Sequence, residues 1–516
     1  MTREASAIGA GLAPARDARP IRAGERIHVL GAAGAGASAA ALLAHQAGAV
    51  VTGCDSGGPS PYTPPLEAAG IVLAWEHDPA HVTGTAPRPD RLAVTKALTA
   101  IAPDHPELVA ARTTGIPIEA WQQVVADAAA EKTLVGVAGT HGKSTTAGWL
   151  VHVLTAAGAD PSAFVGALLQ AETTGGLPAT ARWGRGPAFV VEADEYAGNF
   201  DAYRPAIAVI TSAEWDHPDV FADRAAVTDA LEAWIRRMPD GGTIVANAGD
   251  PGVEALLDHL RDLPLRLVAF ALAEGGSQHG FMRGLTERHA TAAGAATPLI
   301  GRIVSADPAG TTLEIQGLDP LAGPVTARLR TAGRHNAANA LGVAGAALSL
   351  GLPAAAIVAG LGSFPGVGRR LERKGEARGV VVYDDYGHHP TAIRETIRAV
   401  RQRDPERRVW AVYEPLTYHR TAALLDDFAE ALATADAVAV ADIWAGRDPD
   451  TSIASAAGLA AAVARLRPEI TVGAPGSVEA TADWLASRVR DGDAVLVMGG
   501  GRSYRIGERL LELRGD

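Results

Sequence analysis

The stretch "GTHGKSTT", residues 139–146, restricts the possible fold more than any other part of the sequence. The run "KTLVGVA" before it is typical of a strand, and the run "AGWLVHVLTAAG" after it is typical of a helix. Gly142, Lys143 and Ser144 match the phosphate-binding pattern G-x-x-x-x-G-K-[ST], but Val137 stands where that pattern begins with glycine. The loop glycines let backbone N–H groups turn toward a phosphate without obstruction by a Cβ atom. The sequence therefore predicts a variant phosphate-binding loop.

The side chains of this loop have the chemistry of an ATP site. Lys143 can reach the β- and γ-phosphates, and the hydroxyl of Ser144 or Thr145 can bind Mg²⁺. A glycine-rich turn that matches by chance is the alternative, which the strand–turn–helix context disfavours. The residues of the loop predicted to bind ATP are Gly139, Thr140, His141, Gly142, Lys143, Ser144 and Thr145.

Short β-rich runs alternate with Ala/Leu-rich helical runs along most of the 516 residues, which is typical of parallel α/β folds. The strand–turn–helix order starts three times, at "RIHVLGAAGAG", "KTLVGVAGTHGKS" and "RGVVVYDDYGHHP". We therefore expect three α/β domains. Residues 270–332 lose the helical pattern, and we expect an antiparallel β extension of the middle domain there. The predicted division is a flexible N-terminal extension at 1–25, then domains at 26–130, 131–366 and 367–516.

Charge and cysteine content argue against several kinds of function. The net charge of −12 and the pI near 5.7 disfavour nucleic acid as a partner. No run reaches membrane-spanning length, so we expect a cytoplasmic protein without a membrane partner. Cys54 is the only cysteine, which excludes an internal disulfide and fits a reducing compartment. We expect Cys54 to be a small buried residue at the end of a strand.

Another glycine turn, formed by Gly31, Gly34 and Gly36, follows the strand "RIHVL". The start of the next helix would offer free N–H groups to a phosphate. Ala33 stands where the dinucleotide fingerprint has a glycine, and Asp55 follows at about the spacing of a ribose-binding acid. The turn predicts a diphosphate-bearing ligand but does not support a nicotinamide dinucleotide. A purely structural tight turn is the alternative.

Acidic side chains follow two strands of the middle domain. They are Glu192, Asp194 and Glu195 in "FVVEADEY", and Glu214, Asp216 and His217 in "ITSAEWDHPD". Ligands of open α/β sheets bind at the carboxyl ends of strands, so both groups are expected near the phosphate loop. Carboxylate and imidazole suit Mg²⁺ or Mn²⁺. Alternatively, Asp216 caps a helix and His217 is incidental.

Further polar residues accompany later helices and strands. Asn336 and Asn339 in "GRHNAANALG" share one helix face, and amides suit the edge of a base; helix capping is the alternative. The last domain offers Arg369, Arg370, Asp384, Asp385, His388, His389, Tyr418 and Arg420. Its arginines can bind phosphate or carboxylate in a bidentate manner. The adjacent histidines lack a second His or Cys pair at metal spacing, so zinc is not predicted there.

Taken in order, these motifs resemble the Mur ligases, ATP-dependent enzymes that build the peptide stem of peptidoglycan precursors. The resemblance runs from residue 26 to the C-terminus. It is carried by "GTHGKSTT", "EADEY", "EWDHPD", "GRHNAANALG", "GRRLE", "DDYGHHPTAI", "YHRTAALLDDF" and "MGGG". It implies a Rossmann-like N-terminal domain that binds a UDP-substrate, a central P-loop ATPase domain with the β extension, and a Rossmann-like C-terminal domain.

The resemblance also implies a role for each matching residue. Lys143 would bind phosphates, Ser144 and Glu192 would hold one Mg²⁺, and His217 would hold a second, with Mn²⁺ as a possible substitute. Asn336 and Asn339 would lie at the adenine, with Arg370 and Asp385 reaching the nucleotide. His388 and Arg420 would lie near the amino acid and the muramoyl carboxylate. The UDP-substrate would contact Gly34, Ala35, Gly36, Ala37, Ser38 and Asp55.

Within the family, the chain is most similar to the branch that joins L-alanine to UDP-N-acetylmuramate. Other branches carry a carbamylated lysine after the aspartate–histidine motif, whereas this chain has no lysine between Lys143 and Lys374. The chain departs from the family at 414–416, "EPL" in place of "QPH", at Arg502 in place of the aspartate of "GAGD", and at Ala37, where methionine is common. These departures concern the substrates rather than ATP.

The implied reaction converts the lactyl carboxylate to an acyl phosphate, which the amine of L-alanine then displaces. The nearest alternative is a ligase that attaches a recycled tripeptide to the same UDP-sugar. A nicotinamide-dependent oxidoreductase and a non-catalytic nucleotide-binding module are alternatives of other classes. We expect a monomer or a homodimer.

Overall fold

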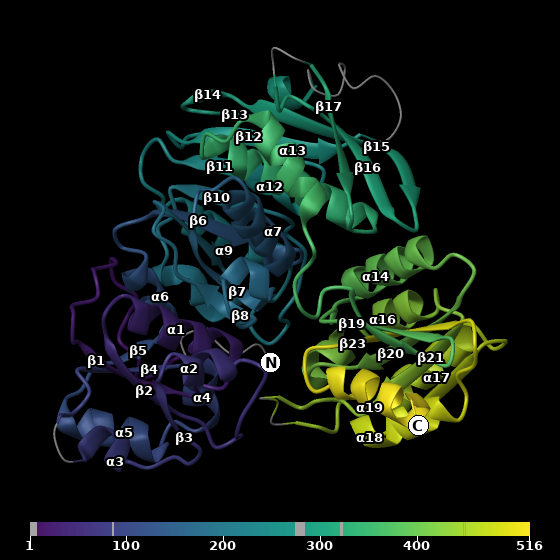
Figure 1. The fold of residues 1–516 in the computed structure, drawn as a ribbon, viewed down its shortest axis with the longest axis horizontal. Coiled ribbons are helices and arrows are strands. Elements are labelled where there is room, and N and C mark those ends of the chain that lie inside the picture. Colours follow the sequence, from purple (N-terminus) through teal and green to yellow (C-terminus); the bar gives the residue numbers. More distant parts are fainter. Residues whose placement is uncertain are drawn as a thin grey trace.

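The computed structural model describes residues 8–84, 87–273, 284–319, 323–446, 448 and 450–515, which form three lobes (Figure 1). Each lobe contains one main sheet. The N-terminal sheet has the order β3-β2-β1-β4-β5, the middle sheet β17-β16-β15-β12-β11-β10-β6-β9-β7-β8, and the C-terminal sheet β18-β19-β23-β20-β21-β22. Among the described residues, no helix is long and apolar enough to cross a membrane.

The N-terminal domain has five parallel strands in the order of a Rossmann-like fold. The helices α1 and α6 cover one face of the sheet, and α3 and α5 cover the other (Figure 1). Its elements are β1 Arg26–Leu30, α1 Ala35–Gln46, β2 Val50–Cys54, α2 Pro64–Ala68, β3 Val72–Ala74, α3 Ala80–Thr83, β4 Arg91–Val94, α4 Lys96–Ile101, α5 Pro106–Thr114, β5 Ile118–Ala120 and α6 Trp121–Ala128.

The middle domain is built on strands such as β6, "TLVGVA", whose apolar side chains are buried on both faces as in a central parallel strand. Its elements are β6 Thr133–Ala138, α7 Lys143–Ala156, β7 Ser162–Leu169, α8 Ala171–Thr174, β8 Ala179–Arg182, β9 Ala188–Glu192, η1 Tyr196–Ala202, β10 Ile207–Ile210, α9 Arg224–Ile235, β11 Thr243–Asn247, α10 Pro251–His259, β12 Arg266–Leu272, β13 Ala290–Thr291, β14 Gly294–Ala295, β15 Thr297–Asp307, β16 Gly310–Gln316, β17 Val325–Leu329, α12 Arg334–Ser349 and α13 Ala354–Ser363.

The predicted β extension is confirmed for the described part of residues 270–332. The strands β15, β16 and β17 pair antiparallel, and β15 joins the parallel sheet through β12. Residues 274–283 and 320–322 lie outside the described residues. The extension thus lengthens the middle sheet on the side away from β7 and β8.

The C-terminal domain has a parallel sheet with one antiparallel edge strand, β18. Its elements are β18 Glu372–Ala377, β19 Val380–Asp385, α14 Pro390–Arg403, β20 Arg408–Glu414, α15 Tyr418–Ala423, α16 Leu425–Leu432, β21 Ala437–Ala441, α17 Ala456–Leu466, β22 Thr471–Gly476, α18 Val478–Ala486, β23 Asp493–Gly499 and α19 Tyr504–Gly515. The expected fold class, three α/β domains, therefore agrees with the structure.

The N-terminal segment differs from the flexible extension that we expected. Its described part, residues 8–25, packs on the N-terminal domain. The guanidinium of Arg16 lies 2.7 Å from a carboxylate oxygen of Asp127 and 3.1 Å from one of Glu119. Because the side chain of Asp127 is fully buried, this ion pair attaches the segment to the end of α6. Hydropathy did not reveal this, since the attachment is ionic.

Candidate active site

A cavity of about 790 Å³ lies where the three domains meet. Gly36 and Trp121 of the N-terminal domain border it, as do the phosphate loop of the middle domain and Arg370 of the C-terminal domain. Because each domain supplies part of the wall, the cavity exists only in this arrangement of the three. Of the predicted residues, the cavity is lined by Gly36, Thr140, His141, Gly142, Lys143, Ser144, Thr145, Glu192, His217, Asn336, Asn339, Arg370, Asp385, His388 and Arg420.

The phosphate loop has the backbone of an anion site. Gly139 and Gly142 have φ values of +125° and +80°, in the region that favours glycine. Gly142 is the N-cap of α7 and provides no side-chain cap, so the first N–H groups of the helix are free of a capping side chain. A Cβ atom on Gly142 would come within 2.5 Å of Oδ1 of Asn339. Glycine is therefore required here by both conformation and space.

Lys143 lies at the centre of the negative charge in the site. Its Nζ atom donates to the carbonyl oxygen of Gly139 at 2.7 Å and to Oε2 of Glu195 at 3.0 Å. Burial opposes the charge of Lys143, but the carboxylates of Glu195 and Asp194 raise its pKa above the ordinary value. The ammonium is consequently charged and held where the loop would receive phosphate.

The two residues predicted to share one Mg²⁺ lie side by side. The hydroxyl of Ser144 donates to Oε1 of Glu192 at 2.9 Å, although 48 positions separate them in the sequence. The other carboxylate oxygen of Glu192 accepts from the backbone N–H of Gly166 at 2.6 Å. Arg370 donates to the Ser144 hydroxyl at 2.7 Å. These contacts orient the oxygen atoms that a hard cation prefers.

His217, predicted to hold a second Mg²⁺, has two carboxylates beside it. One ligand atom each of Asp194, Glu195 and His217 lies within 4.8 Å of the others. Burial lowers the pKa of His217, which leaves its imidazole neutral and able to bind a metal. The sequence placed both acids near the loop but did not pair them with His217.

Asp216 pairs with a residue of the C-terminal domain rather than capping a helix. Nε of Arg420 donates to Oδ1 of Asp216 at 2.7 Å, and Nη2 of Arg420 lies 3.1 Å from Nδ1 of His217. Burial opposes ionisation of Asp216, but the Arg420 guanidinium and neighbouring imidazoles hold the pKa of its carboxyl well below the usual range. The ion pair links the loop after β10 to the start of α15.

His388 is oriented as a neutral imidazole. Its Nδ1 atom lies 2.9 Å from the carbonyl oxygen of Tyr386, so Nδ1 carries the hydrogen and Nε2 has the free lone pair. Nε2 lies 4.0 Å from Oδ2 of Asp216. Burial, reinforced by the charge of Arg420, lowers the pKa of His388 well below its ordinary value. This imidazole is therefore neutral at neutral pH, with the lone pair of Nε2 unprotonated.

The two asparagines of α12 line the cavity beside the loop. Asn336 donates from Nδ2 to the carbonyl oxygen of Ala332 at 2.7 Å, and Nδ2 of Asn339 lies 3.4 Å from Oδ1 of Asn336. The N-cap of α12 is Gly333, so neither asparagine caps the helix.

Asp385 of the C-terminal domain also lines the cavity. Both of its carboxylate oxygens accept backbone N–H groups, those of Leu371 and Gly387, at 2.7 Å, which positions the turn that carries Arg370.

Only some of the predicted UDP-binding residues border the cavity. Gly36 borders the cavity, and a Cβ atom there would lie 2.2 Å from the ring of Trp121. Asp55 instead accepts the backbone N–H groups of Ala33 and Gly57, at 3.1 and 2.8 Å, and stabilises the turn. The residues of this group that do not border the cavity are Gly34, Ala35, Ala37, Ser38 and Asp55.

A cluster that the sequence did not indicate joins the loop to the C-terminal domain. The ligand atoms of His141, Glu214 and His389 lie within 4.8 Å of one another, and Thr391 donates to Glu214 at 2.7 Å. Thr391 follows the histidine pair in "HHPTAI", so this motif could have indicated from the sequence that Thr391 belongs to the site. Lys96, which lines the cavity and donates to the carbonyl oxygen of Ala197 at 2.8 Å, had no such signal.

Comparisons with known proteins agree with this arrangement. Residues 26–133 match "Mur ligase family, catalytic domain", residues 137–347 match "Mur ligase middle domain", and residues 369–501 match "Mur ligase, glutamate ligase domain". The UDP-N-acetylmuramate–L-alanine ligase of Kineococcus radiotolerans is 38% identical over 95% of this chain and 96% of its own length. The chain belongs to the Mur ligase family. The resemblance read from the motifs is thus confirmed.

Other Mur ligases are similar in sequence and in fold. The UDP-N-acetylmuramate–L-alanine ligase of Frankia casuarinae is 36% identical over 95% of this chain and 98% of its own length. The solved UDP-N-acetylmuramate-alanine ligase of Thermotoga maritima shares the fold, with a TM-score of 0.72 and 23% identity over 94% of this chain and 98% of that one. The solved murein peptide ligase of Psychrobacter arcticus has a TM-score of 0.69 and 25% identity, over 96% of this chain and 99% of that one.

Proposed function

We propose that this Mur ligase joins L-alanine to the lactyl carboxylate of UDP-N-acetylmuramate at the expense of ATP, in the synthesis of peptidoglycan precursors. One observation carries the proposal. Lys143, His388 and Arg420, from two domains, line a single cavity in a chain that is 38% identical to a curated L-alanine ligase. An ammonium, a neutral imidazole and a guanidinium in one enclosed space suit the activation of a carboxylate and its attack by an amine.

The first step makes the carboxylate a better acyl donor. An oxygen of the lactyl carboxylate attacks the γ-phosphorus of ATP, and the bond from that phosphorus to the oxygen bridging to the β-phosphate breaks. ADP departs, and the carboxylate has become an acyl phosphate. Lys143 would neutralise phosphate charge, and Arg420 would hold the carboxylate. Mg²⁺, when bound by Ser144 and Glu192 and by His217 with its neighbouring acids, would offset the repulsion between the triphosphate and the carboxylate.

The second step forms the amide. The amine of L-alanine attacks the carbonyl carbon, and the tetrahedral intermediate expels phosphate as the carbon–oxygen bond breaks. The amine must be neutral, and Nε2 of His388 is positioned to take its proton. Enclosure by three domains keeps water from the acyl phosphate.

The nucleotide and the sugar substrate occupy opposite parts of the cavity in this proposal. Asn336, Asn339 and Arg370 lie on the side of the phosphate loop, where ATP would bind. Gly36 and Trp121 border the N-terminal side, where the UDP-substrate would enter. Leu416, which stands where the family has histidine, also lines the cavity, and we assign this departure to the amino-acid side.

The test is to incubate the protein with UDP-N-acetylmuramate, ATP and Mg²⁺ and to supply each amino acid in turn. The ligated mass is expected with L-alanine, together with one phosphate per product. Ligation of the recycled tripeptide but not of L-alanine would instead support the murein-peptide ligase reading, which the Psychrobacter structure keeps open. Binding of NAD without binding of ATP would favour an oxidoreductase.

We also propose domain borders near residues 130 and 367, a cytoplasmic location, and a monomeric or homodimeric state. The borders fall between the last helix of the first sheet and β6, and between α13 and β18. Light scattering on the purified chain would give its mass in solution.

A further inference from the structure

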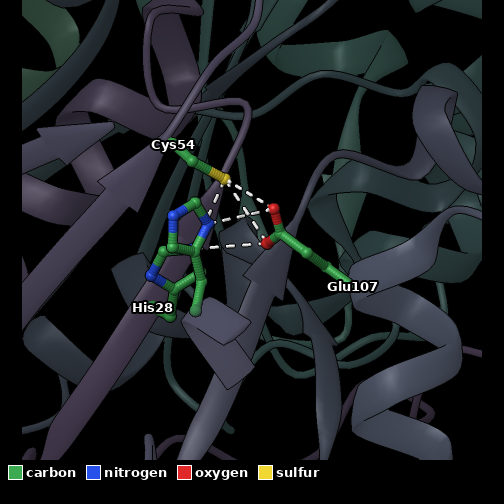
Figure 2. Close-up of side chains that lie close together, drawn as sticks. His28, Cys54 and Glu107 are labelled. Carbon is green, nitrogen blue, oxygen red and sulfur yellow. Dashed lines mark hydrogen bonds and ion pairs between the residues drawn. The ribbon is translucent and has the colours of Figure 1, made fainter. Parts of the chain in front are cut away.

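A second group of chemically reactive side chains lies inside the N-terminal domain, away from the ATP loop. His28 is on β1, Cys54 ends β2, His81 is on α3 and Glu107 is on α5. These elements meet on the face of the sheet that α3 and α5 cover (Figure 1). One ligand atom from each residue lies within 4.8 Å of all the others. Figure 2 shows the side chains of His28, Cys54 and Glu107 directed toward one another.

Four separations within this group are close to those between neighbouring ligands of a four-coordinate metal site. Nε2 of His28 lies 3.3 Å from Oε2 of Glu107 and 3.4 Å from Sγ of Cys54. Sγ of Cys54 and Nδ1 of His81 each lie 3.2 Å from Oε1 of Glu107. Tetrahedral bonds of about 2.0–2.3 Å to zinc place neighbouring ligand atoms roughly 3.3–3.7 Å apart. The remaining pairs of ligand atoms lie within 4.8 Å, so an ion can enter once the side chains farthest apart move together by at most about 1 Å.

The charge balance of the group also favours a cation. The side chain of Glu107 is fully buried, and that of His28 is only 3% exposed. Each ion-pair partner that the described structure provides for Glu107 is a histidine: His28, His77 or His81. The Cys54 thiol and the backbone N–H of Asp78 also donate to Glu107, but neither carries a charge, so burial of this carboxylate remains costly unless a positive charge compensates it. A divalent ion would supply that charge.

We propose that His28, Cys54, His81 and Glu107 bind one Zn²⁺ ion that holds β1, β2, α3 and α5 together. Thiolate, imidazole and carboxylate are zinc ligands, whereas Mg²⁺ prefers oxygen atoms. Binding forms a Zn–S bond as the thiol proton of Cys54 leaves to solvent. Four protein ligands leave no open position, so the ion is structural and takes no part in the ligation reaction.

His77 and His81 lie on the solvent side of this group. Their side chains are 23% and 21% exposed, so an ion can reach the group from solvent. Nδ1 of His77 lies 3.5 Å both from Sγ of Cys54 and from Oε1 of Glu107, and its ring packs edge-on against His105. His77 is thus placed to donate a hydrogen bond to a ligand rather than to complete the set of four.

The first test measures zinc per chain after the protein is incubated with Zn²⁺ and excess Mg²⁺ and then gel-filtered. We expect about one zinc per chain in the wild type and its loss in Cys54→Ala and in His81→Gln, which alters a partly exposed residue. His45→Gln, in α1 of the same domain, and Glu214→Gln, at the ATP cavity, should keep the ion. Circular dichroism confirms that each variant is folded.

Co²⁺ in place of Zn²⁺ provides a second test that depends on one atom. Because Cys54 is the only cysteine, a thiolate-to-cobalt charge-transfer band can come from this site alone. The band and the strong visible bands of four-coordinate cobalt should appear in the wild type and disappear in Cys54→Ala. A wild type without stoichiometric zinc, variants that keep it, or bound cobalt without the charge-transfer band would each overturn the proposal.

Discussion

Arg370 of the C-terminal domain donates a hydrogen bond from Nη2 to the hydroxyl of Ser144 on the phosphate loop, at 2.7 Å. The two residues are 226 positions apart, and one belongs to each side of the cavity. This hydrogen bond holds the C-terminal domain against the phosphate loop. A guanidinium in this position can also reach a phosphate once the nucleotide is bound.

Replacing Arg370 with alanine should lower kcat about 10- to 100-fold, since misplaced reacting groups lose that much rate. The KM for ATP should rise as well, because the loop loses a contact from the closing domain. Steady-state phosphate release measures both. Arg373→Ala, which removes a half-exposed arginine paired with Glu376 on the same strand, β18, serves as the control and should behave as wild type.

Lys143→Ala should reduce kcat about 10²–10³-fold, the usual cost of removing one charged group from developing charge. Lys132 provides a matched control. Its Nζ atom donates to the carbonyl oxygens of Gly184 and Gly186, outside the cavity, so Lys132→Ala should retain turnover. Normal product formation by Lys143→Ala would show that Lys143 is not needed for phosphoryl transfer. A wild type that binds ATP but forms no product would favour a non-catalytic nucleotide-binding module.

His388→Gln should lower kcat about 10²–10⁴-fold if the imidazole is the proton acceptor. The pKa of His388 lies well below its ordinary value because of burial and the charge of Arg420. The wild-type kcat at saturating L-alanine should therefore not fall by half near pH 6.5, where an ordinary histidine is half protonated. Full turnover by the variant with an unchanged pH profile would exclude His388 as the base.

The pH dependence of stability should reveal His389. Burial and the nearby charge of His141 lower the pKa of His389 to about 4. The unfolded chain takes up this proton near pH 6.5 and the folded chain only near pH 4, so the free energy of unfolding falls as pH drops between those values. The loss is about 1.4 kcal/mol per pH unit and roughly 3 kcal/mol in all. Urea unfolding at several pH values should show a shallower slope in His389→Gln, and equal slopes would contradict the assignment.

Arg16→Ala should destabilise the protein by about 1–2 kcal/mol, since it removes an ion pair to the buried carboxylate of Asp127 while Arg91 still pairs with it. Arg22→Ala is the control, because the Arg22 side chain is 75% exposed and lies 3.9 Å from Glu25. That change should stay within about 0.5 kcal/mol. Equal unfolding midpoints for the two variants in guanidinium would mean that residues 8–25 add no stability.

Local features of the chain were predictable because they depend on neighbouring residues. The glycines of the phosphate loop, at Gly139 and Gly142, need positive φ angles, and the apolar run of β6 needs a buried central strand. The motifs by which the family was recognised are also short runs of neighbouring residues. From the sequence, Glu192 and His217 were also predicted to lie after strand ends near the loop, and both line the cavity in the structure.

Contacts between domains were not predictable in this way. The pairing of Asp216 with Arg420 and the meeting of His141, Glu214 and His389 join residues far apart in the chain. Which strands become neighbours, as β6 lies between β10 and β9, follows from the packing of the whole sheet. The attachment of residues 8–25 through Arg16 was missed for the same reason.

Cys54 shows the division most clearly. The sequence alone determined that it is a lone cysteine at the end of a strand, and the usual burial of free cysteines predicted that it is buried, which the structure confirms. Only the tertiary structure decided that His28, His81 and Glu107 surround its sulfur. Strand and helix periodicity act over a few residues, whereas the position of a side chain relative to distant ones is set by how sheets and helices pack.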